Sequence, residues 1–262
     1  HMPLIIALDA VNWWDSRPDL WNFFDPAKPG YDPKNTDNVE WDNPFGVTPP
    51  RIFWRNWGSQ IRIDTPIPNF AAPRYREAIR TLLNRYLPII RDFETHLAPK
   101  DRYLYGGVIV GTEINVGSNH YVYPNPNQYI NSPRECDPGQ EWKGGACPKP
   151  APGACSAYNH NICPEGTTPI GYHAAADLKL GSTITGGVID AIVRDYLSYI
   201  NHVIVVENHL PTHKIYSHVA TPSYSVAQFA TMVPGWSLYY GGATNIGTTA
   251  GPLIESSEAQ RM

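Results

Sequence analysis

The chain has 262 residues, 42% of them hydrophobic and 17% charged, and its formal net charge is −4. This size suits one domain with a substantial core. Because no run of Lys and Arg is present, the sequence argues against a protein that grips a nucleic-acid backbone. No apolar stretch approaches the roughly 20 residues that a membrane span needs. We therefore expect a single domain over residues 1–262, with no nucleic-acid and no membrane partner.

The first predicted element is a strand from Leu4 to Leu8, which is followed directly by Asp9. From Asn12 to about Pro50 the sequence is rich in turn dipeptides such as Asp-Pro and Asn-Pro. Arg51 to Ile63 mixes Trp, Arg, Asn and Gln, which indicates an ordered loop or a short strand on a binding face. These segments form one long connection, and connections longer than about 15 residues are usually functional.

Tryptophan is concentrated in this long connection, since six of the eight tryptophans fall within the first 57 residues. A Trp ring stacks on the apolar face of a sugar, but it also fills a hydrophobic core. Arg and Asn side chains between two such rings carry hydrogen-bond donors that suit sugar hydroxyls. The candidate substrate-binding residues here are Trp13, Trp14, Trp54, Arg55, Asn56 and Trp57. The alternative is a Trp-lined core beneath the loop.

Pro73 to Leu97 is predicted to be a helix because apolar residues recur at helical spacing, and Pro88 should kink it. An apolar run from Tyr103 to Thr112 then predicts a strand buried on both faces. Glu113 follows this strand at once. In barrels of parallel strands, the polar residue after a strand lies at the mouth, where the chemistry occurs. Glu113 is therefore the first candidate for catalysis; alternatively, it caps a loop or pairs with an arginine.

A second long segment runs from Asn115 to about Ile170 and contains a Cys-rich insertion at about 131–167. Its cysteines are Cys136, Cys147, Cys155 and Cys163. No Cys-x-x-Cys pair is present, so we expect two disulfides rather than a zinc ribbon, with three connectivities open. Disulfides indicate a secreted or extracellular protein, although no signal peptide is visible; free thiols in a thermophile's cytosol are the alternative. No pattern indicates a metal ion or a cofactor.

The rest of the chain continues the alternation of helices and strands. We predict a helix from Thr185 to Leu210, a strand from Ile215 to Val219, a short helix from Val226 to Met232 and a strand from Trp236 to Tyr240. Such alternation indicates a parallel α/β arrangement. Long loops after strands and short returns after helices favour a (β/α) barrel of the TIM type. Only four strands are evident where eight are needed, so either strands are hidden in the Trp-rich and Cys-rich regions or the barrel is incomplete.

Three segments resemble (β/α)8-barrel glycoside hydrolases of the retaining clan that includes β-galactosidases, and the chain looks most like an uncharacterised glycoside-hydrolase-like group. The segments are Ile5–Asp9 with the Trp-rich loop after it, Trp54–Gln60, and Gly106–Glu113. The resemblance covers roughly residues 4 to 240 and implies that Glu113 is the general acid/base. It also implies that Thr112 stands where the clan usually has an Asn that contacts the sugar 2-hydroxyl.

By the same resemblance, the chain begins at the third barrel strand and the nucleophile, which should end the seventh, lies beyond Met262 or is absent. Within the chain, Glu255 is the late acid preceded by an apolar pair; its alternative is a surface Glu in a terminal helix. Retaining hydrolysis needs two carboxyls about 5–5.5 Å apart, and inverting hydrolysis about 6.5–9.5 Å. Asp9 is a further candidate: it can partner Glu113, bond a substrate hydroxyl or cap its own loop.

Asn115 and His218 complete the candidate substrate-binding residues. His218 is included because, at the tip of its strand, it can orient Glu113 or a sugar hydroxyl. The sequence thus predicts a glycoside hydrolase acting on a β-linked carbohydrate, with Glu113 as general acid/base. One alternative is a non-catalytic carbohydrate-binding protein, or a truncated barrel that lacks the nucleophile and forms a homo-oligomer through its open sheet edges. Another is a secreted interaction domain that uses the Cys-rich loop for recognition.

Overall fold

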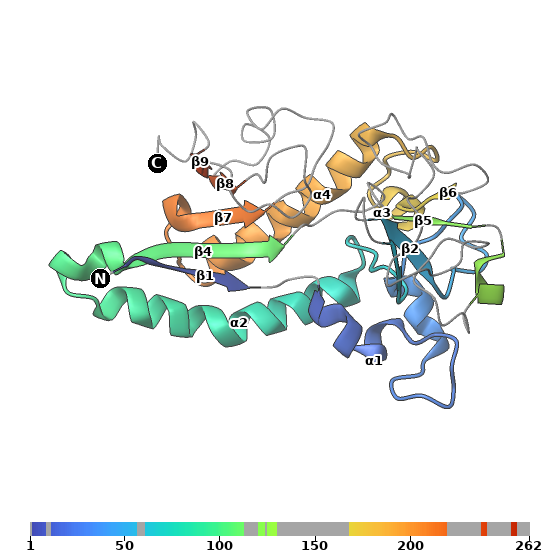
Figure 1. Cartoon of the computed structure of the whole chain (residues 1–262), viewed down its shortest axis with the longest axis horizontal. Helices are drawn as coiled ribbons and strands as arrows, with labels where there is room; N and C mark the ends of the chain where they lie inside the picture. The colour runs from blue at the N-terminus through green and yellow to red at the C-terminus, as the bar shows by residue number, and fades with distance from the viewer. Residues whose placement is uncertain are drawn as a thin grey trace, which may run out of the picture.

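The computed structural model describes residues 2–8, 12–56, 61–112, 120–123, 125–129, 168–218, 237–239 and 253–255. Its main feature is a five-stranded sheet with the order β1-β4-β7-β8-β9 (Figure 1). These strands are β1 (Leu4–Leu8), β4 (Tyr105–Thr112), β7 (Ile215–His218), β8 (Ser237–Tyr239) and β9 (Leu253–Glu255). The first four run parallel and β9 runs antiparallel to β8. The four strands predicted from the sequence are confirmed, and they lie side by side in one sheet.

The two outer strands of this sheet, β1 and β9, each pair with a single neighbour among the described strands. The described hydrogen bonds therefore form an open sheet, and the (β/α) barrel stays a prediction. At the β1 edge, Leu4 and Ile5 are 52% and 40% exposed.

Helix α2 (Pro73–His96) confirms the long helix predicted before β4. Pro73 occupies its first turn, where a missing N–H costs nothing. One face of the helix is buried at positions spaced three to four residues apart, namely Tyr75, Ile79, Leu83, Leu87 and Ile90. The helix continues past Pro88. The carbonyl deprived of an amide partner belongs to Asn84, whose exposed position lets water take the place of that partner.

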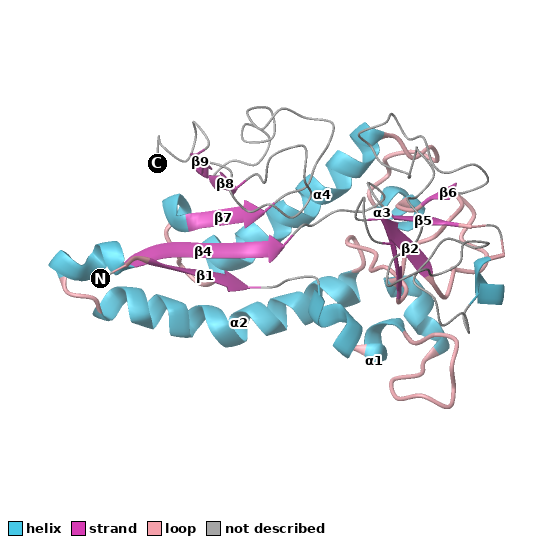
Figure 2. Ribbon diagram, viewed as in Figure 1, coloured by secondary structure: helices cyan, strands magenta, loops and turns pink. Residues whose placement is uncertain are grey.

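Helix α4 (Gly186–Asn201) confirms the second long helix, and the Thr185 hydroxyl caps it by accepting a hydrogen bond from the Val188 N–H (3.3 Å). The helix continues as a π-helix over His202–Glu207. This segment also has the composition of a strand, but the prediction that it ends the helix is confirmed. Figure 2 shows the long helices α2 and α4 running lengthwise beside the strands β1, β4 and β7.

Helix α2 contacts α4 through aromatic rings and an Arg76–Asp195 ion pair, and it contacts the π-helix through a further ion pair. Tyr75 and Tyr196 share a buried hydrogen bond between their hydroxyls (3.0 Å), and Phe70 stacks on Tyr196 with ring centroids 4.5 Å apart. Further along, Arg80 Nε donates to Glu207 of the π-helix (2.8 Å). The second half of α4 is thus fixed to α2 by directional contacts as well as by apolar packing.

A second, antiparallel sheet is built from the two long connections. We call residues 9–72, between β1 and α2, the first excursion, and residues 113–185, between β4 and α4, the second excursion. The strand order is β3-β2-β5-β6, with β2 (Phe53–Asn56), β3 (Ile61–Asp64), β5 (His120–Val122) and β6 (Thr168–Pro169). For residues 51–63, the short-strand interpretation is confirmed. Strands β5 and β6 have no counterpart in the sequence predictions. We refer to these four strands as the loop-built sheet.

Buried asparagines order the first excursion. Asn22 Nδ2 donates to the carbonyls of Asp25 (3.0 Å) and Pro29 (3.1 Å), and Asn38 Nδ2 donates to the carbonyl of Leu20 (2.9 Å). Asn35 does the same for the Gly30 carbonyl (3.1 Å). All three asparagine side chains are buried. Their amide groups supply hydrogen bonds to carbonyls that no helix or sheet hydrogen bond satisfies. The turn-rich composition therefore produces an ordered loop, which includes the short helix α1 (Pro18–Trp21).

Two predictions for the C-terminal part need comment. The expectation that Glu255 sits in a terminal helix is wrong, because Leu253–Glu255 forms strand β9 against β8. The short helix expected at Val226–Met232 lies outside the described residues. Among the helices that the structure describes, none is both long enough and apolar enough to cross a membrane.

Candidate functional site

The carboxyl ends of the parallel strands bring two of the predicted site residues to one edge. Thr112, the last residue of β4, is the register partner of His218, the last residue of β7. His218 in turn pairs with Tyr239 at the end of β8. Glu113 follows Thr112 directly in the sequence, but it lies outside the described residues. The backbone thus confirms that this candidate acid follows a central strand, next to the strand that carries His218.

The loop-built sheet stands beyond this carboxyl edge, past the arrowheads of β1, β4 and β7 (Figure 1). Its central pairing joins the two excursions, since Trp54 of β2 is opposite Tyr121 of β5 and Arg55 is opposite His120. The Trp-Arg-Asn segment singled out in the sequence therefore lies against the strand that begins seven residues after Glu113. In α/β folds, ligands bind outside the carboxyl ends of the parallel strands, which is where the two excursions meet.

The predicted stacking tryptophans divide into two groups. Trp14 and Trp54 are 3% and 1% exposed, and the Trp14 Nε1–H donates to the carbonyl of Pro66 (2.7 Å). Both rings belong to the core, as in the alternative interpretation. Trp13 is only partly buried; it stacks on Tyr75 at 6.1 Å, and the guanidinium of Arg17 lies 5.2 Å from its ring centroid. Of these three rings, Trp13 is the one that is not fully buried.

Several predicted residues have no described position. Asp9, Trp57, Glu113, Asn115 and the four cysteines lie outside the described residues. For Arg55, Asn56, Thr112, His218 and Glu255, the structure describes the backbone alone.

Strand register separates Glu255 from the edge where Glu113 follows β4. Glu255 is opposite Ser237, the first residue of β8, whereas Leu253 is opposite Tyr239, the last. Glu255 therefore lies toward the amino end of the parallel strands. It is also three strand spacings from β4, or about 14 Å, and a retaining pair needs about 5–5.5 Å. The sheet does not bring Glu255 to the end of β4.

Sequence reasoning missed a buried pair of titratable side chains in the loop-built sheet. His120 Nε2 lies 3.6 Å from Asp64 Oδ2, and the two side chains are 5% and 10% exposed. Their positions are 56 residues apart in the chain, in β5 and β3. No local spacing links them, because only the order of strands in this sheet brings them together.

A second missed feature joins the two excursions at helix α3 (Tyr172–Asp177). The helix begins after Gly171, which has no side chain to cap it. The fully buried Glu40 takes that role, since its carboxylate accepts hydrogen bonds from the backbone N–H groups of His173 (3.1 Å) and Ala174 (3.3 Å). Burial nevertheless raises the pKa of Glu40 to about 8. A lone Glu in a loop shows no sequence signal for this role.

The same joint is completed by the ring of His173. Its Nδ1 is 2.7 Å from the carbonyl oxygen of Val39, and Trp41 stacks on it with ring centroids 3.9 Å apart. Two neighbours of Glu40 in the first excursion thus hold the second excursion by a hydrogen bond and by ring stacking. We call these contacts between Val39–Trp41 and helix α3 the joint between the excursions. The joint holds the two excursions together, and it presents no reactive group to solvent.

No match was found to a protein-family model, to a curated protein or to a solved structure. Within the described residues, no three His, Cys, Asp or Glu side chains gather closely enough to hold a metal ion.

Proposed function

We propose that this protein is a glycoside hydrolase that acts on a β-linked carbohydrate, with Glu113 as the general acid/base, on a (β/α)-barrel type of scaffold. The observation that carries the proposal is the position of Glu113 in the chain. It comes directly after β4, which lies between β1 and β7 in a parallel sheet. The residue before it, Thr112, is opposite His218. The resemblance of Gly106–Glu113 to the retaining clan gives the chemistry.

In this proposal, protonated Glu113 donates its proton to the glycosidic oxygen as the bond to the anomeric carbon breaks. In retaining chemistry, the second carboxylate bonds the anomeric carbon as that bond breaks, and the Glu113 carboxylate then takes a proton from the water that releases the sugar. The proposal gives Thr112 and His218, which end neighbouring strands, the role of hydrogen-bonding a sugar hydroxyl, and it gives Trp13 the role of an aromatic contact. These roles use one carboxyl group, and the reaction requires two.

Asp9 is the proposed second carboxylate, because it follows β1, the direct neighbour of β4. As a nucleophile it would give retention of configuration, and as a base acting on water it would give inversion. The two outcomes differ in the anomer released first, which proton NMR of the fresh product distinguishes.

The position of Glu255 favours one other function. Because residue Glu255 lies toward the amino end of the strands, a chain whose Asp9 plays no catalytic part would bind a glycan without cleaving it. This non-catalytic carbohydrate-binding protein is the second candidate.

Hydrolysis of a panel of aryl β-glycosides tests the proposal. We expect the Glu113→Gln variant to lose roughly a hundredfold to ten-thousandfold in rate, because Gln donates no proton. Glu77→Gln is the matched control, since that side chain is 64% exposed on α2 and should leave the rate unchanged. Equal rates for Glu113→Gln and the unmodified chain would contradict the assignment. Glycan binding without turnover by the unmodified chain would support the non-catalytic candidate.

A further inference from the structure

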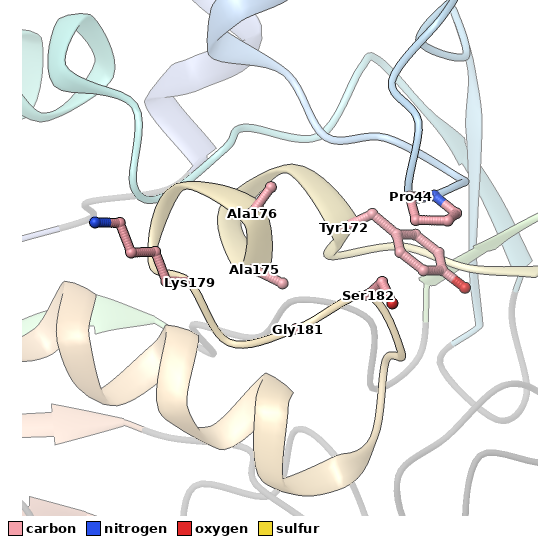
Figure 3. Close-up of a pocket in the computed structure, with 7 residues that line it drawn as sticks. All are labelled: Pro44, Tyr172, Ala175, Ala176, Lys179, Gly181 and Ser182. Atoms are coloured by element: carbon pink, nitrogen blue, oxygen red, sulfur yellow. The ribbon is translucent and has the colours of Figure 1, made fainter.

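A pocket of about 500 Å³ lies between the two excursions, and none of its lining residues belongs to the parallel strands. Pro44 of the first excursion forms one wall, and α3 with the turn after it forms the rest. The lining residues are Pro44, Tyr172, Ala175, Ala176, Lys179, Gly181 and Ser182. In Figure 3, Tyr172, Pro44 and Ser182 occupy one end of the pocket and Lys179 the other, with the two alanines between them. Its volume is within the range of ligand pockets, about 300–1,000 Å³.

The lining combines an apolar surface with a polar rim. The Tyr172 ring, Pro44 and the alanine methyl groups provide the apolar part. At one end the rim carries the hydroxyls of Tyr172 and Ser182. At the other end lies Lys179, whose side chain extends away from them (Figure 3). The phenol of Tyr172 is a protonated donor at neutral pH, as for any tyrosine, and burial and the nearby Asp42 carboxylate raise its pKa further. A pyranose ring has the matching character, with C–H groups on its faces and hydroxyls around its edge.

The pocket wall is fixed before any ligand arrives. Helix α3 is held at its start by Glu40, as described above, and near its end Asn69 Nδ2 donates to Asp177 Oδ2 (2.8 Å). The turn that follows has two residues with left-handed backbone, Lys179 (φ 59°) and Gly181 (φ 99°). A Cβ on Gly181 would meet no atom within 4 Å, so glycine suits this position for its conformation and not for lack of space. A preorganised wall lowers the entropic cost of binding.

We propose that this pocket is a subsite for one sugar residue of a β-linked glycan, separate from the position of Glu113. This inference rests on the proposed function. The lining alone indicates a ligand with an apolar ring and a polar edge, and the proposed function identifies that ligand as a sugar. A glycan long enough to reach both positions would then bind more tightly than a single glycoside, since the second contact is made within one complex.

Titration calorimetry with β-linked oligosaccharides of two to six units tests the subsite, with the Glu113→Gln chain used throughout to prevent turnover. The further substitution Ala176→Leu fills the pocket from an exposed position, and we expect it to weaken binding of the longest ligand by roughly tenfold or more. Lys179→Gly removes the side chain that lines the other end of the pocket, at a position whose φ suits glycine; the expected loss is about threefold to tenfold. Ala27→Leu, in an exposed turn, is the matched control and should change nothing.

Unchanged affinity in both pocket variants would overturn the subsite, as would a parent chain that binds no oligosaccharide of the panel. Lys179→Gly keeps the test decisive if Ala176→Leu fails to fold, which a thermal melt of each variant reveals. The hydrolysis experiment on Glu113 is read separately. A chain that hydrolyses aryl glycosides but keeps full affinity in the pocket variants refutes the subsite alone. A chain whose activity is independent of Glu113, but whose affinity for the oligosaccharides falls in the pocket variants, refutes the role of Glu113 and supports the subsite.

Discussion

In the parallel sheet, α2 precedes β4 and α4 precedes β7 along the chain, whereas the loop-built sheet joins segments that are far apart in the chain. Along α2, buried residues such as Ile79, Leu83 and Leu87 repeat with the period of a helix. In the loop-built sheet, β2 has β3 on one side and, from the other excursion, β5 on the other. We call the parallel sheet with α2 and α4 the parallel layer, and the two excursions with their sheet the loop-built layer. Fully buried side chains occur in both layers; the layers differ in whether local or distant segments make the contacts.

The largest expected effect is the loss of a buried ring from the loop-built sheet. Trp54→Ala should lower the free energy of unfolding by about 3–5 kcal/mol, because the ring is 1% exposed and contacts Tyr123 edge-on at 5.1 Å. Urea unfolding followed by far-UV circular dichroism gives the value. Phe45→Ala is the control, since Phe45 is an 81% exposed aromatic of the same excursion, and we expect a change within about 0.5 kcal/mol.

Following the same transition by tryptophan fluorescence sharpens the comparison. Most tryptophans of the chain are in the first excursion, so tryptophan fluorescence reports on the unfolding of the loop-built layer. Far-UV circular dichroism reports mainly on the long helices α2 and α4. Coincident curves for Trp54→Ala mean that the two layers unfold as one unit. A loss below about 1 kcal/mol would mean that the Trp54 ring is not a core residue, and it would return this ring to the list of candidate sugar-stacking residues.

What the sequence predicted follows the same division between local and long-range signals. The parallel strands and both long helices were predictable because periodicity and composition are properties of one continuous segment. Placing Thr112 and His218 at a common edge followed from two strand ends in a parallel sheet. Strand β9, with three residues, is too short to carry a pattern, so Glu255 was assigned to the wrong kind of element.

The missed features all depend on distant partners. The Asp64–His120 pair and the capping of α3 by Glu40 join positions that no spacing rule connects. Composition also cannot tell a tryptophan that stacks on a sugar from one that fills a core. Trp14 and Trp54 proved to be core rings, and Trp13 is partly exposed. Burial separates these residues, and burial depends on the whole fold.

The next effect in size is a pH dependence that comes from the joint between the excursions. Burial raises the pKa of Glu40 from 4.5 to about 8, so the folded chain binds this proton more tightly than the unfolded chain does. The resulting stability is fully present below pH 4.5 and is lost as the pH rises through about 8. Glu40→Gln should remove this dependence, which amounts to a few kcal/mol at most.

Thermal or urea unfolding of both chains between pH 4 and 9 measures the effect as a difference. All other titrating groups are shared, so they cancel when the Glu40→Gln curve is subtracted. The two groups nearest the carboxylate, His173 and Asp177, also remain in both chains. If the free energy of unfolding changed with pH in the same way for the two proteins, the pKa of Glu40 would be the same in the folded and unfolded states. Glu40 would then act in the joint as an ordinary ionised cap.

The smallest expected effect lies in the parallel layer and comes from a single local contact. Thr185→Ala removes the hydroxyl that caps α4 at the Val188 N–H, and we expect a loss of about 1 kcal/mol. Thr95→Ala is the matched control: its hydroxyl bonds the Asp92 carbonyl within α2 and caps no helix start, so alanine should be neutral or slightly stabilising there. If Thr185→Ala cost as much as Trp54→Ala, the stability of the parallel layer would depend on one terminus, and the contrast between the two layers would fail.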